Sequence, residues 1–122
     1  MTCVGGTCMS CIFCMIAGKE IPSSVVYEND DVICFHDLHP AAPVHVLIVP
    51  KKHYDDILDL SSSEDGGKTM EAILSAVSVV AGMTGVEEGF RLINNCRAFG
   101  GQTVMHVHFH LIGGVRIGEK LL

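Results

Sequence analysis

Three histidines alternate with apolar residues near the C-terminal end of the chain, in the run MHVHFHLI. Side chains two residues apart in a β-strand project from the same face, so residues 104–112 predict a strand with His106, His108 and His110 in one row. The opposite face of this strand is predicted to pack into the core through Met105, Val107, Phe109 and Leu111. Imidazoles act as metal ligands, acids, bases or nucleophiles near neutral pH, so the row indicates a site of chemistry.

Two other interpretations of the histidine row stay open at this point. The first is a strand with three solvent-facing histidines, although a polar face can be built from simpler residues. The second is a catalytic zinc site with three histidine ligands. The sequence contains no HExxH motif or other companion of the known metallohydrolases, so nothing else in it supports the second interpretation.

The remaining elements predict an α+β fold with a mainly antiparallel five-stranded sheet, one long helix and one short helix. The short helix lies in the run CIFCMIAGKEIP and ends at Gly18. A capping box from Ser61 to Glu64 precedes the long helix, whose apolar periodicity covers residues 70–83. The strands are predicted over residues 25–28, 31–38, 45–50, 90–95 and 104–112, and the third of them is apolar enough to be buried on both faces.

Length and charge limit the organisation of the chain and its partners. A chain of 122 residues suggests one compact domain, with residues 1–10 as a flexible leader and residues 11–122 as a single domain. The net charge of −6 argues against a broad electrostatic interaction with nucleic acid. Neither a secretory signal nor a membrane-spanning stretch is evident, so we expect a cytoplasmic protein without a membrane partner.

Several motifs in the chain resemble those of one family in the same order. The resemblance lies in residues 106–112, in the preceding Gly100-Gly101-Gln102-Thr103, and in the segments 35–38, 42–53, 11–14 and 21–22. On these residues the chain resembles the histidine triad (HIT) superfamily. The nearest branch is that of the histidine triad nucleotide-binding proteins, which are similar to purine nucleoside phosphoramidase and are also called protein kinase C inhibitor-like. The resemblance implies a HIT-like fold.

The resemblance also implies a hydrolase that cleaves at the α-phosphate of AMP- or GMP-like purine nucleoside 5′-phosphoramidates. His108 would attack the phosphate and form a nucleotidyl-histidine intermediate, while His110 and His45 would relay protons. No organic cofactor is implied. Two alternatives are a nucleotide-binding regulatory protein whose catalysis is incidental and a dinucleoside polyphosphate hydrolase.

The family pattern assigns nucleotide-binding roles to further residues of this chain. The base pocket would be lined by Phe13, Ile16, His36 and Leu38. Asp37 would accept hydrogen bonds from the ribose hydroxyls, and Asn95 would lie beside the phosphate and ribose. Phosphate donors would come from Gly101, Gln102 and Thr103, with His108 and His110 completing the set.

The pair Cys11 and Cys14 has the CxxC spacing of zinc sites, although a single pair is a weak signal. By resemblance to the zinc-binding members of the family, His53 and His106 would complete a structural zinc site. Cys8 forms the same spacing with Cys11, and packed thiols without a metal are the alternative.

The family resemblance further implies a homodimer in which the long helix and the 90–95 strand lie at the interface. The sequence is 48% hydrophobic, which fits a domain that buries part of its surface against a partner. The tail after Gly114 lacks the His-Trp-Pro-Pro ending of some relatives, so the leaving group is not implied by the resemblance.

Overall fold

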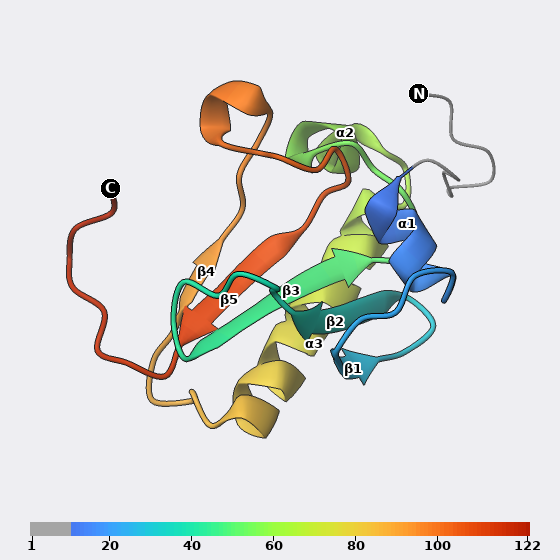
Figure 1. Ribbon diagram of the computed structural model, residues 1–122. Helices are drawn as coiled ribbons and strands as arrows, with labels where there is room; N and C mark the ends of the chain where they lie inside the picture. The colour runs from blue at the N-terminus through green and yellow to red at the C-terminus, as the bar shows by residue number, and fades with distance from the viewer. Residues whose placement is uncertain (1–10) are drawn as a thin grey trace.

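The computed structural model describes residues 11–122, and the prediction of a flexible leader over residues 1–10 lies outside them (Figure 1). Five strands form one antiparallel sheet in the spatial order β1-β2-β3-β5-β4. Their bounds are β1 Val25–Glu28, β2 Val32–His36, β3 Val44–Pro50, β4 Arg91–Ile93 and β5 Phe109–Gly113. The predicted α+β class with a five-stranded antiparallel sheet is confirmed.

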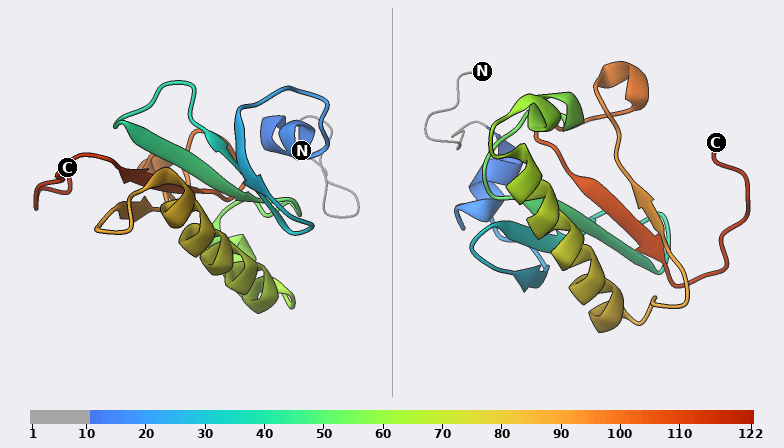
Figure 2. Two further views of the ribbon diagram at one scale, coloured as in Figure 1. Left: turned by 90° about the horizontal axis from the view of Figure 1, so that it is seen from below. Right: turned by 180° about the vertical axis from the view of Figure 1, so that it is seen from behind.

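Helices cover the two faces of this sheet unequally. The long helix α3, Gly66–Thr84, crosses one face, and the short helix α1, Ile12–Ala17, lies on the other (Figure 2). The structure adds a second short helix, α2, over Ile57–Ser62 and a 3-10 turn, η1, over Ala98–Gly100. Within residues 11–122, no helix combines the length and the apolar character that a membrane crossing requires.

Strand β3 explains how one sheet supports a core on each face. Its side chains alternate with period two. Val46 and Ile48 therefore pack into the cluster beneath α3, and Leu47 and Val49 pack into the cluster beneath α1. All four are buried, as the apolar run predicts for a strand covered on both sides.

The start of the helical region differs from the prediction. Ser61 lies inside α2, where its hydroxyl donates to the carbonyl of Leu58, and the capping box predicted there is wrong. Asp56 is the N-cap of α2, because its carboxylate accepts the Asp59 N–H at 2.8 Å, whereas Asp65, the N-cap of α3, makes no side-chain capping bond. Helix α3 begins at Gly66, directly against α2.

The histidine strand is shorter than residues 104–112. Regular pairing with β3 ends at Phe109, opposite Ile48, although β3 itself continues to Pro50 in its pairing with β2. Residues 104–108 are held by other contacts, among them the Val107 N–H donating to the Tyr54 carbonyl at 2.7 Å. The alternation still buries Val107, whereas Met105 is 46% exposed, so its placement in the core is wrong.

Candidate active site

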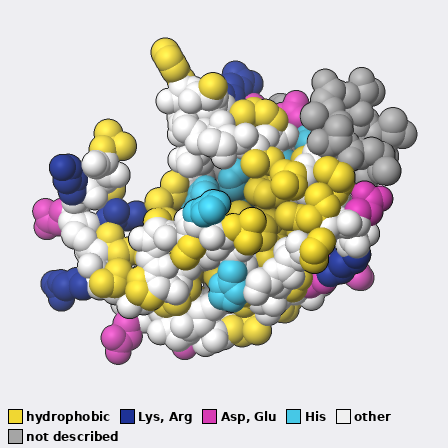
Figure 3. Space-filling view, in the orientation of Figure 1, with side chains coloured by type: hydrophobic (Ala, Val, Ile, Leu, Met, Phe, Trp, Pro, Cys, Tyr) yellow, Lys and Arg dark blue, Asp and Glu magenta, His cyan; other side chains and the backbone are white. Residues whose placement is uncertain are grey.

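The three imidazoles lie on the face of the sheet that carries α1. His106 and His108 are buried and His110 is partly buried. The ring of Phe13, from α1, meets His106 and His108 edge-on, with ring centroids 5.9 and 5.0 Å apart. Histidine side chains reach the surface on this face among hydrophobic ones (Figure 3). The predicted row of imidazoles is therefore present and lies against apolar side chains, including Phe13.

His108 is held in one tautomer by its own strand segment. Its Nδ1 lies 2.7 Å from the main-chain oxygen of His106, and because a carbonyl only accepts, Nδ1 carries the proton. Burial lowers the pKa of His108, so the ring is neutral near pH 7. Its Nε2 then has a free lone pair, which is the form that a nucleophilic imidazole needs.

His110 meets His45 across the β3–β5 pair, where Nε2 of His45 lies 2.9 Å from Nδ1 of His110. The Ala41 N–H donates to Nδ1 of His45, so in the neutral ring the proton is on Nε2 and is donated to His110. His110 consequently carries its own proton on Nε2. Burial lowers the pKa of His110 to about 4, with the rings of His108 and His45 adding to the effect.

Asp37 joins this pair, with Oδ2 3.5 Å from Nε2 of His45. The ligand atoms of Asp37, His45 and His110 all lie within 4.8 Å, so three metal-binding residue types come together. Since Nδ1 of His45 already accepts a backbone N–H, its Nε2 is protonated and offers no lone pair to an ion. The hydrogen bonding of this group fits proton transfer better than metal binding.

The glycine loop before the histidine row uses most of the donors predicted to bind phosphate. The Gly101 N–H donates to Ala98, and the Gln102 N–H donates to Arg97. The Gln102 amide donates to the carbonyls of Asp55 and Val104, at 2.7 and 2.9 Å. Among the described residues, Thr103 donates neither its N–H nor its hydroxyl to another group. Gln102 thus braces the loop, and Thr103 is the predicted donor that stays available.

The residues predicted to surround the nucleoside divide into two groups. Phe13 and Ile16 are buried on α1, in the cluster that this helix forms with the sheet. His36 and Leu38 are exposed where β2 ends, and Leu38 is 90% accessible. Asp37 lies between them and Asn95 follows β4, both partly exposed. Their nucleotide-binding roles stay predictions.

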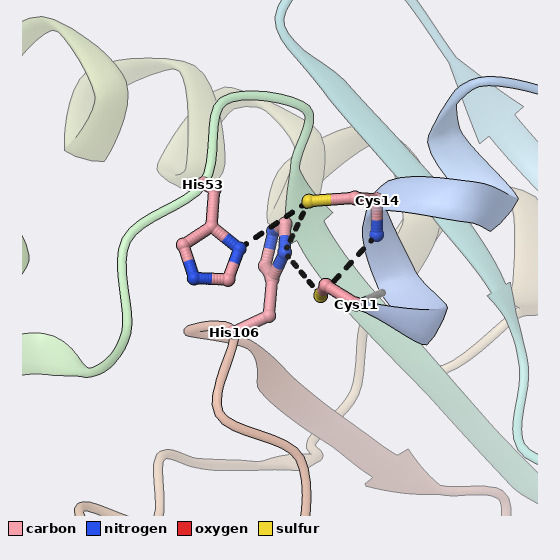
Figure 4. A group of neighbouring side chains, drawn as sticks. All are labelled: Cys11, Cys14, His53 and His106. Carbon is pink, nitrogen blue, oxygen red and sulfur yellow. Dashed lines mark hydrogen bonds between the residues drawn. The ribbon is translucent and has the colours of Figure 1, made fainter. Parts of the chain in front are cut away.

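The four residues predicted to bind zinc converge beside the buried end of the histidine row (Figure 4). Cys11 is the N-cap of α1 and Cys14 lies in its first turn. Sγ of Cys11 lies 3.3 Å from Nδ1 of His106, and Sγ of Cys14 lies 3.3 Å from Nδ1 of His53. Sγ of Cys14 is also 3.5 Å from Nδ1 of His106.

These distances and tautomers suit a tetrahedral ion. Zinc bonds of about 2.3 Å to sulfur and 2.0–2.1 Å to nitrogen separate the two ligand atoms by about 3.5 Å. Nε2 of His106 donates to the Pro50 carbonyl, and Nε2 of His53 lies 2.8 Å from the Asp55 carboxylate. Both rings therefore turn a lone pair on Nδ1 toward the sulfurs, with the outer hydrogen bond that metal-binding histidines usually make. The donor set fits zinc.

The sequence did not indicate three residues that support the site, Asn94, Arg97 and Asp56. Asn94 donates its amide to the His108 carbonyl at 2.9 Å, just beyond the last β4–β5 pair. Arg97 pairs with Asp56 and supports the glycine loop. Each contact joins residues at least 14 positions apart, so no local spacing pattern could have indicated it.

Comparison with known proteins agrees with this geometry. The model of the HIT domain matches residues 18–117, which is most of the chain. The chain belongs to the HIT family. Among its relatives, the purine nucleoside phosphoramidase of Escherichia coli K12 is 38% identical over 111 residues, covering 90% of this chain and 92% of that protein. A 14 kDa zinc-binding protein of Brassica juncea is 43% identical over 104 residues, covering 84% and 91%.

A solved structure extends the HIT assignment to the whole fold. A HIT family hydrolase from Clostridium thermocellum superposes with a TM-score of 0.89 at 44% sequence identity. The match covers 95% of this chain and 100% of that one. The predicted HIT-like fold is therefore confirmed over nearly the full length.

Proposed function

We propose that this HIT protein hydrolyses purine nucleoside 5′-phosphoramidates to the nucleoside monophosphate and a free amine. The observation that carries the proposal is the His108 ring, which is neutral, fixed in one tautomer and free at Nε2. The phosphoramidase of E. coli, a relative over nearly its whole length, supports the choice of substrate. AMP- and GMP-like nucleotides are the expected ligands, and no organic cofactor is required.

In the proposed first step, Nε2 of His108 forms a bond to the α-phosphorus while the bond from phosphorus to the amine breaks. Splitting a difficult hydrolysis into two displacements is the advantage of covalent catalysis. The Thr103 N–H and hydroxyl are the available donors for the negative charge that develops on the phosphoryl oxygens. Asp37 would bind the ribose, and Asn95 would lie beside the phosphate.

The leaving amine needs a proton, and His110 carries one on Nε2. We propose that the His110–His45 pair supplies this proton from its singly protonated form, after taking up a proton from solvent, so that donation leaves two neutral rings. In the second step, water attacks the nucleotidyl-histidine, the bond from phosphorus to His108 breaks, and the pair takes a proton back from the water. The pair ends each cycle unchanged, as general acid–base catalysis requires.

The test is turnover of adenosine 5′-phosphoramidate and guanosine 5′-phosphoramidate by the purified protein. His108→Ala should lower kcat by several powers of ten. Trapping of an acid-labile adenylylated chain by the parent protein, and not by His108→Ala, would establish the covalent step. Faster turnover of diadenosine polyphosphates would favour the dinucleoside polyphosphate hydrolase instead. Binding of AMP without any turnover would favour the regulatory alternative.

We also propose that Cys11, Cys14, His53 and His106 hold one structural zinc ion. The spacing of their ligand atoms and the orientation of both imidazoles support this assignment. All four tetrahedral positions are filled by protein, so the ion would stabilise the fold without touching substrate. It would tie α1 to the segment after β3 and to the histidine row.

A homodimer is the proposed assembly. Strand β4 is at the edge of the sheet, where its outer backbone groups can pair with a second copy. On α3, Leu74 and Met83 are each more than half exposed, which leaves apolar surface for a partner. Sedimentation at micromolar concentration should give twice the chain mass of 13.1 kDa. A species of single chain mass would contradict the dimer.

A further inference from the structure

The glycine loop between β4 and the histidine row closes on one residue, Arg97. The N–H groups of Gly100 and Gln102 both donate to the Arg97 carbonyl at 3.0 Å. The Arg97 N–H in turn donates to Oε1 of Gln102 at 2.6 Å. The conformation of the loop, and with it the place of Thr103, therefore depends on how Arg97 is held.

The backbone φ of Arg97 is 62°, a left-handed conformation that residues other than glycine rarely adopt. A residue other than glycine adopts positive φ only where its surroundings determine it. The side chain supplies one such determinant, since its Nε lies 2.9 Å from Oδ2 of Asp56. The Arg97 side chain is 63% exposed, so the ion pair matters more for the geometry it imposes on the loop than for its energy.

Asp56 is a firm anchor for this contact. Its side chain is only 8% exposed, and its second oxygen accepts the Asp59 N–H as the N-cap of α2. The hydrogen bond from the Asp59 N–H lowers the pKa of the Asp56 carboxyl most, and the Arg97 guanidinium is the next largest cause. The neighbouring Asp55 carbonyl accepts from the Gln102 amide, so the loop is fixed to residues 55–56 at two points.

We propose that Arg97 is a positioning residue for the reaction, whose ion pair with Asp56 holds the 97–103 loop so that Thr103 meets the substrate phosphate. This inference rests on the proposed hydrolysis. The substrate phosphate is already anionic, but its oxygens gain charge in the transition state, so displacing the loop lowers kcat more than it raises KM. If the ion pair only stabilised the fold, its removal would lower Tm without lowering kcat relative to KM.

Three single variants separate the backbone from the side chain. Arg97→Gly removes the guanidinium and adopts the positive φ without strain. Arg97→Lys keeps the positive charge but lacks the planar guanidinium donor. Asp56→Asn keeps the N-cap acceptor and removes the anion. With adenosine 5′-phosphoramidate, we expect Arg97→Gly and Asp56→Asn each to lose about tenfold in kcat, with KM within about twofold of the parent.

Arg97→Lys should recover part of the kcat lost in Arg97→Gly. The double variant Arg97→Gly/Asp56→Asn should be no slower than Arg97→Gly, because both changes remove one interaction. The matched control is Ile73→Val in α3, a buried residue on the other face of the sheet, which should lower Tm but keep kcat. An unchanged kcat in Arg97→Gly, or an equal loss in Ile73→Val, would overturn the proposal.

A second measurement keeps this result distinct from failure of the proposed function. If the parent protein does not cleave phosphoramidates, hydrogen exchange of the Gly100 and Gln102 amides still reports on the loop. These amides should exchange at least about tenfold faster in Arg97→Gly and Asp56→Asn, while β3 keeps its protection. Unchanged exchange at both amides would show that the ion pair does not hold the loop, whatever the substrate.

Discussion

The main-chain oxygen of His106 lies 2.7 Å from Nδ1 of His108 and accepts a hydrogen bond from it. The same His106 points its own Nδ1 at the sulfurs of Cys11 and Cys14, 3.3 and 3.5 Å away. One residue therefore contributes its side chain to the Cys/His cluster and its carbonyl to His108, the proposed nucleophile. The two sites are joined by a single amino acid, so the integrity of the first affects the placement of the second.

The zinc proposal predicts one equivalent of zinc in protein produced without a metal-affinity tag. Cys11→Ser and Cys14→Ser should each lose most of this zinc and lower Tm, because ion binding contributes to folding free energy. Metal analysis and thermal unfolding with and without a chelator measure both effects. Cys96→Ser is the control, since Cys96 lies outside the cluster. A parent protein without zinc, or zinc unchanged in both variants, would indicate packed thiols only.

Asn94 should influence catalysis although it lies outside the predicted site. Its amide donates to the His108 carbonyl at 2.9 Å, where the β4–β5 pairing has already ended. Asn94→Asp replaces the donor by a carboxylate that repels this carbonyl. We expect kcat to fall about tenfold, as for a small displacement of a reacting group. Steady-state kinetics measure kcat, and thermal unfolding measures Tm of the same variant. A kcat equal to that of the parent would contradict a role of Asn94 in catalysis.

Stability should decrease as the pH falls below neutrality. Burial lowers the pKa of His110 from 6.5 to about 4. Between these values the unfolded chain binds a proton on this ring that the folded chain does not. The contribution of His110 is therefore complete above pH 6.5, declines as the pH falls toward 4, and is constant below that.

Urea unfolding at several pH values between 4 and 7.5 measures this dependence. In His110→Gln, the slope of the unfolding free energy against pH should be smaller by up to one proton, which is about 1.4 kcal/mol per pH unit. Parallel curves for the parent and the variant would contradict a neutral His110 in the folded state.

Two adjacent glycines at the start of α3 should respond to alanine in opposite ways. A Cβ on Gly66 would lie 2.1 Å from the Leu60 carbonyl oxygen, whereas a Cβ on Gly67 would meet nothing within 4 Å. Gly66→Ala should cost about 1–3 kcal/mol through overpacking. Gly67→Ala should gain about 0.5–1 kcal/mol through helix propensity. Chemical denaturation tests the pair, and similar effects of both would refute the close α2–α3 contact.

The sequence predicts those elements whose signal is local and periodic. The apolar run 45–50 predicts a strand buried on both faces, and β3 is such a strand. Gly18 ends α1 as predicted, and Gly85 ends α3 in the left-handed conformation that C-terminal glycines commonly adopt. The alternation of histidines gives the correct face for His106 and His108, although neither residue belongs to a regular strand.

Other features depend on partners far away in the sequence. Residues 104–108 have strand-like alternation, but β3 offers them no partner beyond Ile48. The bracing role of Gln102 is set by carbonyls that only the folded chain brings within reach, including that of Asp55. Glycine is the residue expected at positive φ, so Arg97 gave no local sign of its conformation. Contacts between residues far apart in the sequence determine these features, and local sequence patterns do not reveal such contacts.

The alternation of side chains along β2 and β3 separates the interior into two clusters that share only the sheet. The larger cluster contains α3, and the buried part of the smaller one joins Cys11 and residues of α1 to four sheet residues, Ile33, Phe35, Leu47 and Val49. We expect a small cluster under a six-residue helix to open at lower free energy than the global fold. Phe13, which contacts His108, belongs to that cluster. The face that carries His108 should therefore exchange its amide hydrogens with solvent faster than the core beneath the long helix.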